Sequence, residues 1–193
     1  LRNSSAASDV YKRQHHDLPV ADASKEDLLK ADLLPYTALM PELDAIMACH
    51  LHFPKIDPEM PASLSRTILT GLLRDQIGYN GLILTDDLDM GAIVNHYGRG
   101  NDIKLALEAG ADIALICHNM ANLPEVLSSL QINEDQDSLL RIENQRFNLC
   151  RPPDFTESKW KDLNEEMTQL TSEVIGKERF EVDFPSQSPV EDY

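Results

Sequence analysis

Short apolar runs alternate with amphipathic stretches along the middle of the chain. The runs at 45–49, 81–85 and 113–117 are continuous rather than alternating, which is typical of strands in a parallel sheet covered on both faces. Between them, apolar residues recur at helical spacing, with Ser24 and Ser65 as candidate N-caps. The pattern predicts helices over 24–34, from Ser65 to Gly78, up to Gly110, over 122–130 and within 135–150. The series predicts an α/β fold, either doubly wound or a barrel.

A carboxylate ends the strand predicted at 81–85. The apolar run stops at Asp86, which Asp87 and Asp89 follow before a Gly-Ala turn. An acid at the carboxyl end of a buried parallel strand lies where α/β barrels carry their active sites. A second interpretation is that the three acids cap the following helix, because Asp is a common N-cap residue.

The charge and the apolar content narrow the classes of partner. The 193 residues are 42% hydrophobic, and 33 acidic against 17 basic residues give a formal net charge of -16. Such a chain should repel phosphate backbones, which argues against nucleic acid as a partner. Each apolar run is far shorter than the roughly 18 to 20 residues of a membrane span, so no membrane contact is expected. The sequence does not determine the oligomeric state.

The three cysteines, Cys49, Cys117 and Cys150, are widely spaced and odd in number. Their spacing matches neither a metal site nor a disulfide framework. They are interpreted as buried thiols in a reducing compartment, which predicts a cytoplasmic location.

Both ends of the chain differ from its middle. Residues 1–14 have neither an apolar signal region nor a structural period, and are interpreted as foreign or disordered sequence. From Pro152 the chain is acidic and is expected to pack loosely or to be disordered. The expected organisation is therefore a segment 1–14, a domain 15–150 and an acidic extension 151–193.

Several short motifs share an order and spacing that is more specific than any one of them. They are His50-Leu-His-Phe-Pro54, Asp57-Pro-Glu-Met-Pro-Ala-Ser-Leu-Ser65, Leu72-Leu-Arg74, Gly78-Tyr-Asn-Gly81, Thr85-Asp-Asp-Leu-Asp-Met90 and Glu108-Ala-Gly-Ala-Asp112. Together they resemble glycoside hydrolase family 3 over roughly residues 15–148, most closely its bacterial β-N-acetylhexosaminidase branch. Asp87 stands where the β-glucosidase branch usually has Trp, which favours this assignment.

The resemblance implies a (β/α)8 TIM barrel, here roughly its C-terminal half, and a retaining hydrolase that releases terminal β-linked N-acetylhexosamine. The substrate class would be carbohydrate, for example N-acetylglucosamine on peptidoglycan fragments, and no cofactor or metal is implied. Asp86 would be the nucleophile that forms a covalent glycosyl-enzyme. His15 would be the general acid/base, with His16 as the second choice, because imidazole titrates near neutrality. His50 would line the pocket, and Met90 would keep the backbone close to the sugar.

The chain departs from the family pattern at two places. The acid that partners the catalytic histidine in the family falls at position 13, which is Arg13 here. A cation beside His15 would disfavour the protonated imidazole. The upstream barrel strands and a sugar-binding Lys-His pair have no counterpart in this sequence. The chain by itself is therefore expected to be an incomplete and inactive fragment.

Two alternatives remain open at this point. Side chains alternate along a strand, so His50 and His52 should point to the same side of a strand end. With His15, His118 and Asp86 they could form the site of a metal-dependent amidohydrolase. The chain could also be a non-catalytic interaction module in which Asp86 is a structural acid. His96, Tyr97, His118 and Trp160 are otherwise interpreted as ordinary loop or packing residues.

Overall fold

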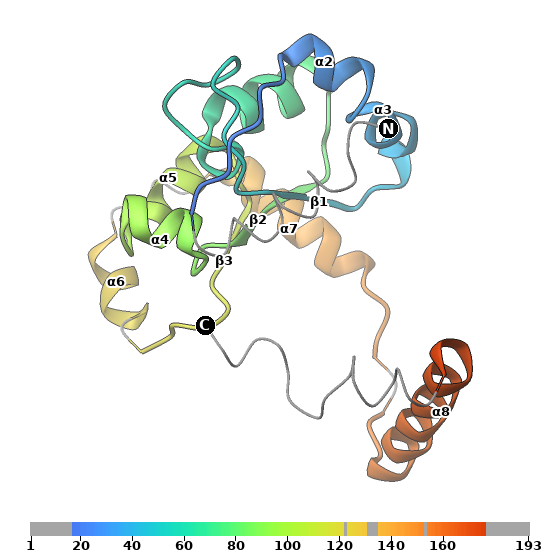
Figure 1. Ribbon diagram of the computed structural model, residues 1–193. Coiled ribbons are helices and arrows are strands. Elements are labelled where there is room, and N and C mark those ends of the chain that lie inside the picture. Colours follow the sequence, from blue (N-terminus) through green and yellow to red (C-terminus); the bar gives the residue numbers. More distant parts are fainter. Residues whose placement is uncertain (1–16, 122, 131–134, 153, 177–193) are drawn as a thin grey trace. The chain divides into compact units, whose positions relative to one another are not determined.

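The computed structural model of the chain describes residues 17–121, 123–130, 135–152 and 154–176. The segment 1–14 and the last residues of the extension lie outside this part, so the expectations about them stay predictions. The chain divides into two compact units, Leu1–Leu149 and Cys150–Tyr193, and each is described by itself (Figure 1).

A three-stranded parallel sheet is the centre of the first unit. Its strands are β1 (Ala45–Ala48), β2 (Leu82–Asp87) and β3 (Ile113–Leu115), in the spatial order β1-β2-β3. β1 pairs with β2 in continuous register, whereas the ladder between β2 and β3 contains an irregularity. The fold is therefore α/β, and all three predicted strands form.

Helices precede, connect and follow the strands in Figure 1. Before β1 lie α2 (Lys25–Lys30), α3 (Leu34–Leu39) and the 3-10 helix η1 (Met40–Glu42). Between β1 and β2 lie the 3-10 helix η2 (Ala62–Leu64) and the π-helix η3 (Thr67–Gln76). Between β2 and β3 lie α4 (Gly91–Tyr97) and α5 (Asn101–Ala109), and after β3 come α6 (Leu123–Ser129) and α7 (Gln136–Asn148).

Local signals determine several of these boundaries. Ser24 caps α2 in a capping box, in which the Ser24 hydroxyl accepts the Asp27 amide and the Asp27 carboxylate accepts the Ser24 amide. The Ser65 hydroxyl accepts the Ile68 amide at 3.1 Å at the start of η3. Gly110 ends α5 with φ +110°, a conformation that side chains disfavour.

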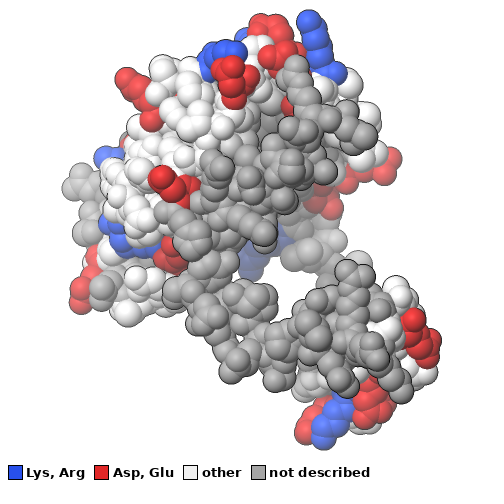
Figure 2. All heavy atoms as spheres, viewed as in Figure 1, with Lys and Arg blue, Asp and Glu red and all other residues white. Residues whose placement is uncertain are grey.

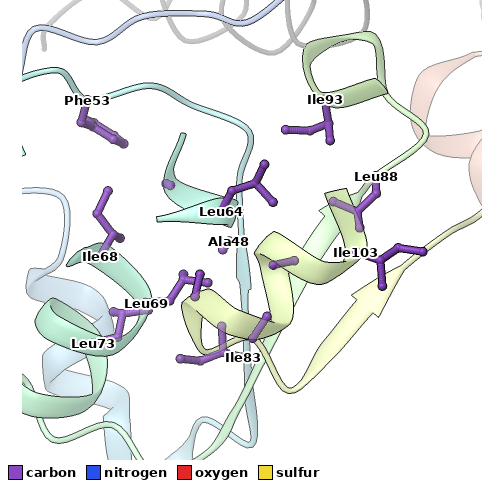
Figure 3. Packing of buried hydrophobic residues seen from close by; sticks show 14 of the residues in the cluster. Ala48, Phe53, Leu64, Ile68, Leu69, Leu73, Ile83, Leu88, Ile93 and Ile103 are labelled. Atoms are coloured by element: carbon purple, nitrogen blue, oxygen red, sulfur yellow. The ribbon is translucent and has the colours of Figure 1, made fainter. Parts of the chain in front are cut away.

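The hydrophobic core lies between β2 and two helices of the first unit. In Figure 3 the Ile83 side chain of β2 lies near Leu69 and Leu73 of η3, and Ile103 of α5, a member of the same buried cluster, lies near Leu88. Ile83 and Leu69 are completely buried. In contrast, Met47 of β1 is 57% exposed, so the expectation that both sheet faces are covered is wrong at this strand. The sequence pattern could not reveal this exposure, because Met47 is as apolar as its covered neighbours.

One buried carboxylate joins four elements of the core. Asp112, directly before β3, accepts the Ile83 amide of β2 at 2.7 Å and a nitrogen of Arg74 of η3 at 2.6 Å. Its other oxygen accepts two nitrogens of Arg141 of α7, at 2.9 and 2.8 Å. Two guanidinium groups and a backbone amide together offset the desolvation of the carboxylate.

The expectation of buried cysteines is wrong. Cys49, Cys117 and Cys150 are exposed: Cys49 directly follows β1, and Cys117 and Cys150 lie two residues after the ends of β3 and α7. The extension is expected from its sequence to pack loosely or to be disordered, and disorder is excluded over the 19-residue helix α8 (Glu157–Ile175). Throughout the described residues, no helix is both long enough and apolar enough to cross a membrane.

The Asp112 arrangement predicts a large loss of stability when its charge is removed. Asp112→Asn leaves two guanidinium groups beside a neutral amide and should lower the free energy of unfolding by about 3–5 kcal/mol in a urea titration. The control Asp75→Asn, at an exposed position of η3, should change it by about 0.5 kcal/mol or less. Equal stabilities of the two variants would contradict the structural role of Asp112.

Candidate functional site

The candidate site lies at the carboxyl ends of the three strands. Parallel strands present these ends at one edge of the sheet, which brings their following residues together. Asp86 and Asp87 end β2, His50 follows β1, and His118 follows β3. A hydrogen bond from His50 and an ion pair with His118 both reach Asp87. The structure therefore brings together two of the predicted site residues, Asp86 and His50, and adds His118.

Among the described residues, Asp86 makes fewer interactions than Asp87 or Asp89. Its side chain is half-buried, and one carboxylate oxygen accepts the Asp87 amide at 2.8 Å. Within the described part of the chain, the Asp86 carboxylate makes no ion pair. No described side chain therefore neutralises its charge.

Asp87 connects β2 to both neighbouring strands. Its backbone carbonyl accepts the His50 ring at 2.8 Å, beyond β1. One carboxylate oxygen accepts the amides of Asp89, at 3.0 Å, and Cys117, at 3.1 Å. The other carboxylate oxygen lies 3.2 Å from the Nε2 atom of His118.

Asp89 fastens the loop after β3. One of its oxygens accepts the amides of His118, at 2.8 Å, and Asn119, at 2.9 Å, and the other is paired with Arg99. Burial by itself would raise the pKa of Asp89, but the two amides and the Arg99 charge outweigh it and hold that pKa below its usual value. Asp89 is thus maintained as a carboxylate that binds this loop.

The interpretation of the acids as helix caps is wrong. The N-cap of α4 is Met90, and it makes no capping hydrogen bond through its side chain. Asp87 and Asp89 instead bind amides about 30 positions further along the chain. Local sequence could not separate these two roles, because both place an acid in a turn before a helix.

Arg99 connects this loop to α5. Besides Asp89, it lies 3.2 Å from the Asp102 carboxylate at the start of α5. Asp102 is completely buried, and its other oxygen accepts the amides of Gly100 and Ile103. Burial raises the pKa of Asp102 despite these partners. The guanidinium group therefore compensates two acids at once.

His50 is completely buried, and both ring nitrogens are used within the protein. Its Nε2 atom lies 2.8 Å from the Asp87 carbonyl, which can only accept, so Nε2 carries the proton. Its Nδ1 atom lies 2.7 Å from the Ser63 hydroxyl, which then donates. Burial lowers the pKa of His50 and favours this neutral ring. Met90, the other predicted sugar-binding residue, is also buried.

The described residues do not provide the set of metal ligands that the metal-hydrolase alternative requires. The His52 ring bonds to the Asp57 carbonyl at 3.0 Å, while His50 bonds to Ser63 and Asp87. Among the residues that the structure describes, no group of three or more His, Cys, Asp and Glu side chains is arranged to hold a metal ion.

The remaining predicted site residues lie outside the described part of the chain. These are His15, His16 and Arg13. The nearest described residue, Asp17, accepts the His96 ring at 3.0 Å, at the end of α4. The sequence pattern places His118 only in the metal-hydrolase alternative and otherwise predicts an ordinary loop residue. The signal that could have identified it is its position directly after a predicted strand.

Comparisons with known proteins agree on one family. The family model described as "Glycosyl hydrolase family 3 N terminal domain" matches residues 5–144. A protein of Thiobacillus denitrificans named beta-hexosaminidase is 32% identical over 148 residues, which are 76% of this chain and 41% of that protein. A beta-hexosaminidase of Pseudomonas aeruginosa is 35% identical over 117 residues, 61% of this chain and 35% of its own length.

A solved structure is similar as well. It is a glycoside hydrolase family 3 beta-N-acetylglucosaminidase from a Paenibacillus species, with a TM-score of 0.64 and 31% identity. The similarity covers 75% of this chain and 30% of that one. The chain thus spans about two fifths, or less, of the length of these relatives.

The neutral His50 ring predicts a specific pH dependence. The pKa of His50 is lower in the folded chain than in the unfolded chain. As the pH falls below about 6.5, His50 is therefore protonated in the unfolded chain before it is protonated in the folded chain. The free energy of unfolding should therefore decrease as the pH falls from about 6.5 towards the folded pKa, by at most about 1.4 kcal/mol per pH unit from this group. His50→Gln should remove that part of the slope in urea titrations.

The matched control is His96→Gln, at an exposed position, which should retain the slope. A direct check is the ring ¹⁵N signal of His50, expected to stay that of neutral imidazole below pH 6.5. A His50 ring that becomes protonated at or above this pH contradicts the assignment.

Proposed function

Because the chain belongs to the glycosyl hydrolase family 3 N-terminal domain family, we propose that its sheet is a sector of a (β/α)8 barrel. The proposed activity is a retaining glycosidase that releases terminal β-linked N-acetylhexosamine. The parallel order β1-β2-β3 and the grouping of polar residues at the strand ends support this proposal.

The observation that carries the proposal is the division of roles among three neighbouring acids. Asp87 and Asp89 are engaged with His118, Arg99 and backbone amides. Asp86 makes no ion pair with any described residue, although it ends the same strand. A nucleophilic carboxylate must be free to bond to the substrate, and Asp86 meets that requirement best.

The proposed reaction has two steps. In the first, an Asp86 oxygen attacks the anomeric carbon, the bond to the leaving oxygen breaks, and His15 donates a proton to that oxygen. In the second, a water oxygen attacks the same carbon, the bond to Asp86 breaks, and His15 takes the proton of the water. Two inversions retain the β configuration.

The buried residues contribute through the backbone. His50 is proposed to hold the end of β2 in place through its bond to the Asp87 carbonyl. Met90, as the N-cap of α4, is proposed to hold the backbone that follows Asp86. Because both side chains are buried, we propose that they support the sugar site by holding its backbone and do not contact the sugar themselves.

Contacts of the chain just after His15 support its assignment. The Ala21 amide bonds to the His52 carbonyl, and the His52 amide bonds to the Pro19 carbonyl, both at 2.9 Å. These bonds tie residues 19–21 to the loop after β1, at the sheet edge that carries the site. The position of Asp17 beside His96 of α4 agrees with this placement.

The substrate and setting are proposed from the relatives. The names beta-hexosaminidase and beta-N-acetylglucosaminidase point to a terminal N-acetylhexosamine such as N-acetylglucosamine. Peptidoglycan fragments are proposed as one source of this sugar, and the cytoplasm as the setting. The 193-residue chain alone is proposed to have little turnover, because Arg13 stands beside His15 in the sequence and the described sheet has three strands.

A fluorinated N-acetylglucosaminyl fluoride tests the nucleophile separately from the acid. Fluoride leaves without protonation, so the covalent adduct should form even if His15 is inefficient. Mass spectrometry of the folded full chain should find one sugar per chain, on the peptide that contains Asp86. Asp86→Asn should remove the label completely, while the exposed control Asp75→Asn should keep it.

An unlabelled but folded chain, or a label on another residue, contradicts the proposed nucleophile. An interaction module would take no label at all. The unmodified chain should also leave an aryl N-acetyl-β-glucosaminide unhydrolysed. Turnover that Asp86→Asn abolishes would contradict the proposed inactivity while supporting the nucleophile.

A further inference from the structure

The helix α8 carries an exposed apolar stripe at a regular spacing. The stripe consists of Trp160, Leu163, Met167, Leu170 and Val174, whose side chains are between 49% and 75% exposed. Successive members are three, four, three and four residues apart, which is the seam of a two-stranded coiled coil. The helix lies beyond residue 144, where the match to the family model ends.

We infer that α8 pairs with α8 of a second copy of this chain, as an antiparallel two-helix coiled coil. In proteins most of the stability of a helix comes from packing its apolar face, and α8, with 19 residues, carries such a face. The stripe needs a partner with the same spacing. Among the described residues, no other helix carries five apolar side chains at that spacing, so a second α8 is the matching partner.

The charges beside the stripe favour the antiparallel orientation. In that arrangement Trp160 faces Leu170 of the second copy, and Leu163 faces Met167. Lys159 then lies beside Glu173 of the other helix, and this opposite-charge pair occurs twice. Asn164 faces Asn164 of the second copy, and Glu166 faces Glu166 of the second copy. The Glu166 pair is the one unfavourable contact.

A parallel arrangement brings no such pairing. It would place Lys159 beside Asn164 and Glu166 beside Thr171, so neither contact joins opposite charges. The two attractive pairs of the antiparallel form therefore decide the orientation.

The polar face argues against a lipid surface as the partner. α8 carries five acidic residues, Glu157, Asp162, Glu165, Glu166 and Glu173, against the two lysines Lys159 and Lys161. Figure 2 shows acidic and basic side chains together on this unit. Helices that lie on anionic membranes have basic polar faces, whereas this face has a net charge of -3 (2 - 5).

Sedimentation equilibrium of the full chain tests the pairing. The apparent mass should rise from that of one chain to twice that value with concentration, with dissociation in the micromolar range because the helix is short. Leu163→Asp places a charge in the seam and should weaken dimerisation about a hundredfold or more. The matched control Thr168→Asp, on the outer face of α8, should leave dimerisation unchanged.

A charge exchange tests the orientation. Lys159→Glu should weaken the dimer about tenfold, because it creates two like-charge pairs. The double variant Lys159→Glu/Glu173→Lys should restore the original affinity. A chain that stays monomeric at every concentration, or a dimer that Leu163→Asp does not weaken, overturns the pairing. Failure of the double variant to restore affinity overturns the antiparallel arrangement.

Discussion

The hydrogen bonds that join the carboxyl ends of the three strands are the constraint on which the rest of the site depends. β2 ends in a run of acids, and the second of them, Asp87, bonds to residues that follow both β1 and β3. Asp89 then fixes the next two amides of the β3 loop. Because these bonds involve backbone amides and a carbonyl, they determine where the chain runs and not only where side chains point.

This arrangement separates two acids with structural partners from the acid proposed to react. Asp87 and Asp89 are compensated by His118 and Arg99, and Arg99 also compensates the buried Asp102. Asp86, directly before Asp87, pairs with neither His118 nor Arg99 among the described residues. The neighbouring acids would repel one another without their partners, so the bonds of Asp87 and Asp89 help Asp86 to remain at the strand end. The chemical role of Asp86 is the one proposed above.

The sequence predicted the features of the fold that depend on local interactions. The strands, the Ser24 cap and the glycine end of α5 all follow from residues a few positions apart. Ser65 bonds to the first turn of η3 as expected, although the N-cap is its neighbour Arg66. The roles of Asp87 and Asp89 could not be predicted in this way, because their partners are about 30 residues away. Exposure of the cysteines and of Met47 depends on what covers the sheet, which apolar patterning does not report. The acidic composition of the extension predicts loose packing or disorder, whereas the regular spacing of its apolar residues is what favours the helix α8.

The most direct test compares the free energy of unfolding of Asp86→Asn and Asp87→Asn in urea titrations at neutral pH. Asp87→Asn removes the charge that binds His118 and the Cys117 amide, and should lower that free energy by about 1–3 kcal/mol. Asp86→Asn removes a charge with no described ion partner, and should change it by about 0.5 kcal/mol or less. If Asp86→Asn destabilises the chain as much as Asp87→Asn does, Asp86 is a structural acid and the account is wrong.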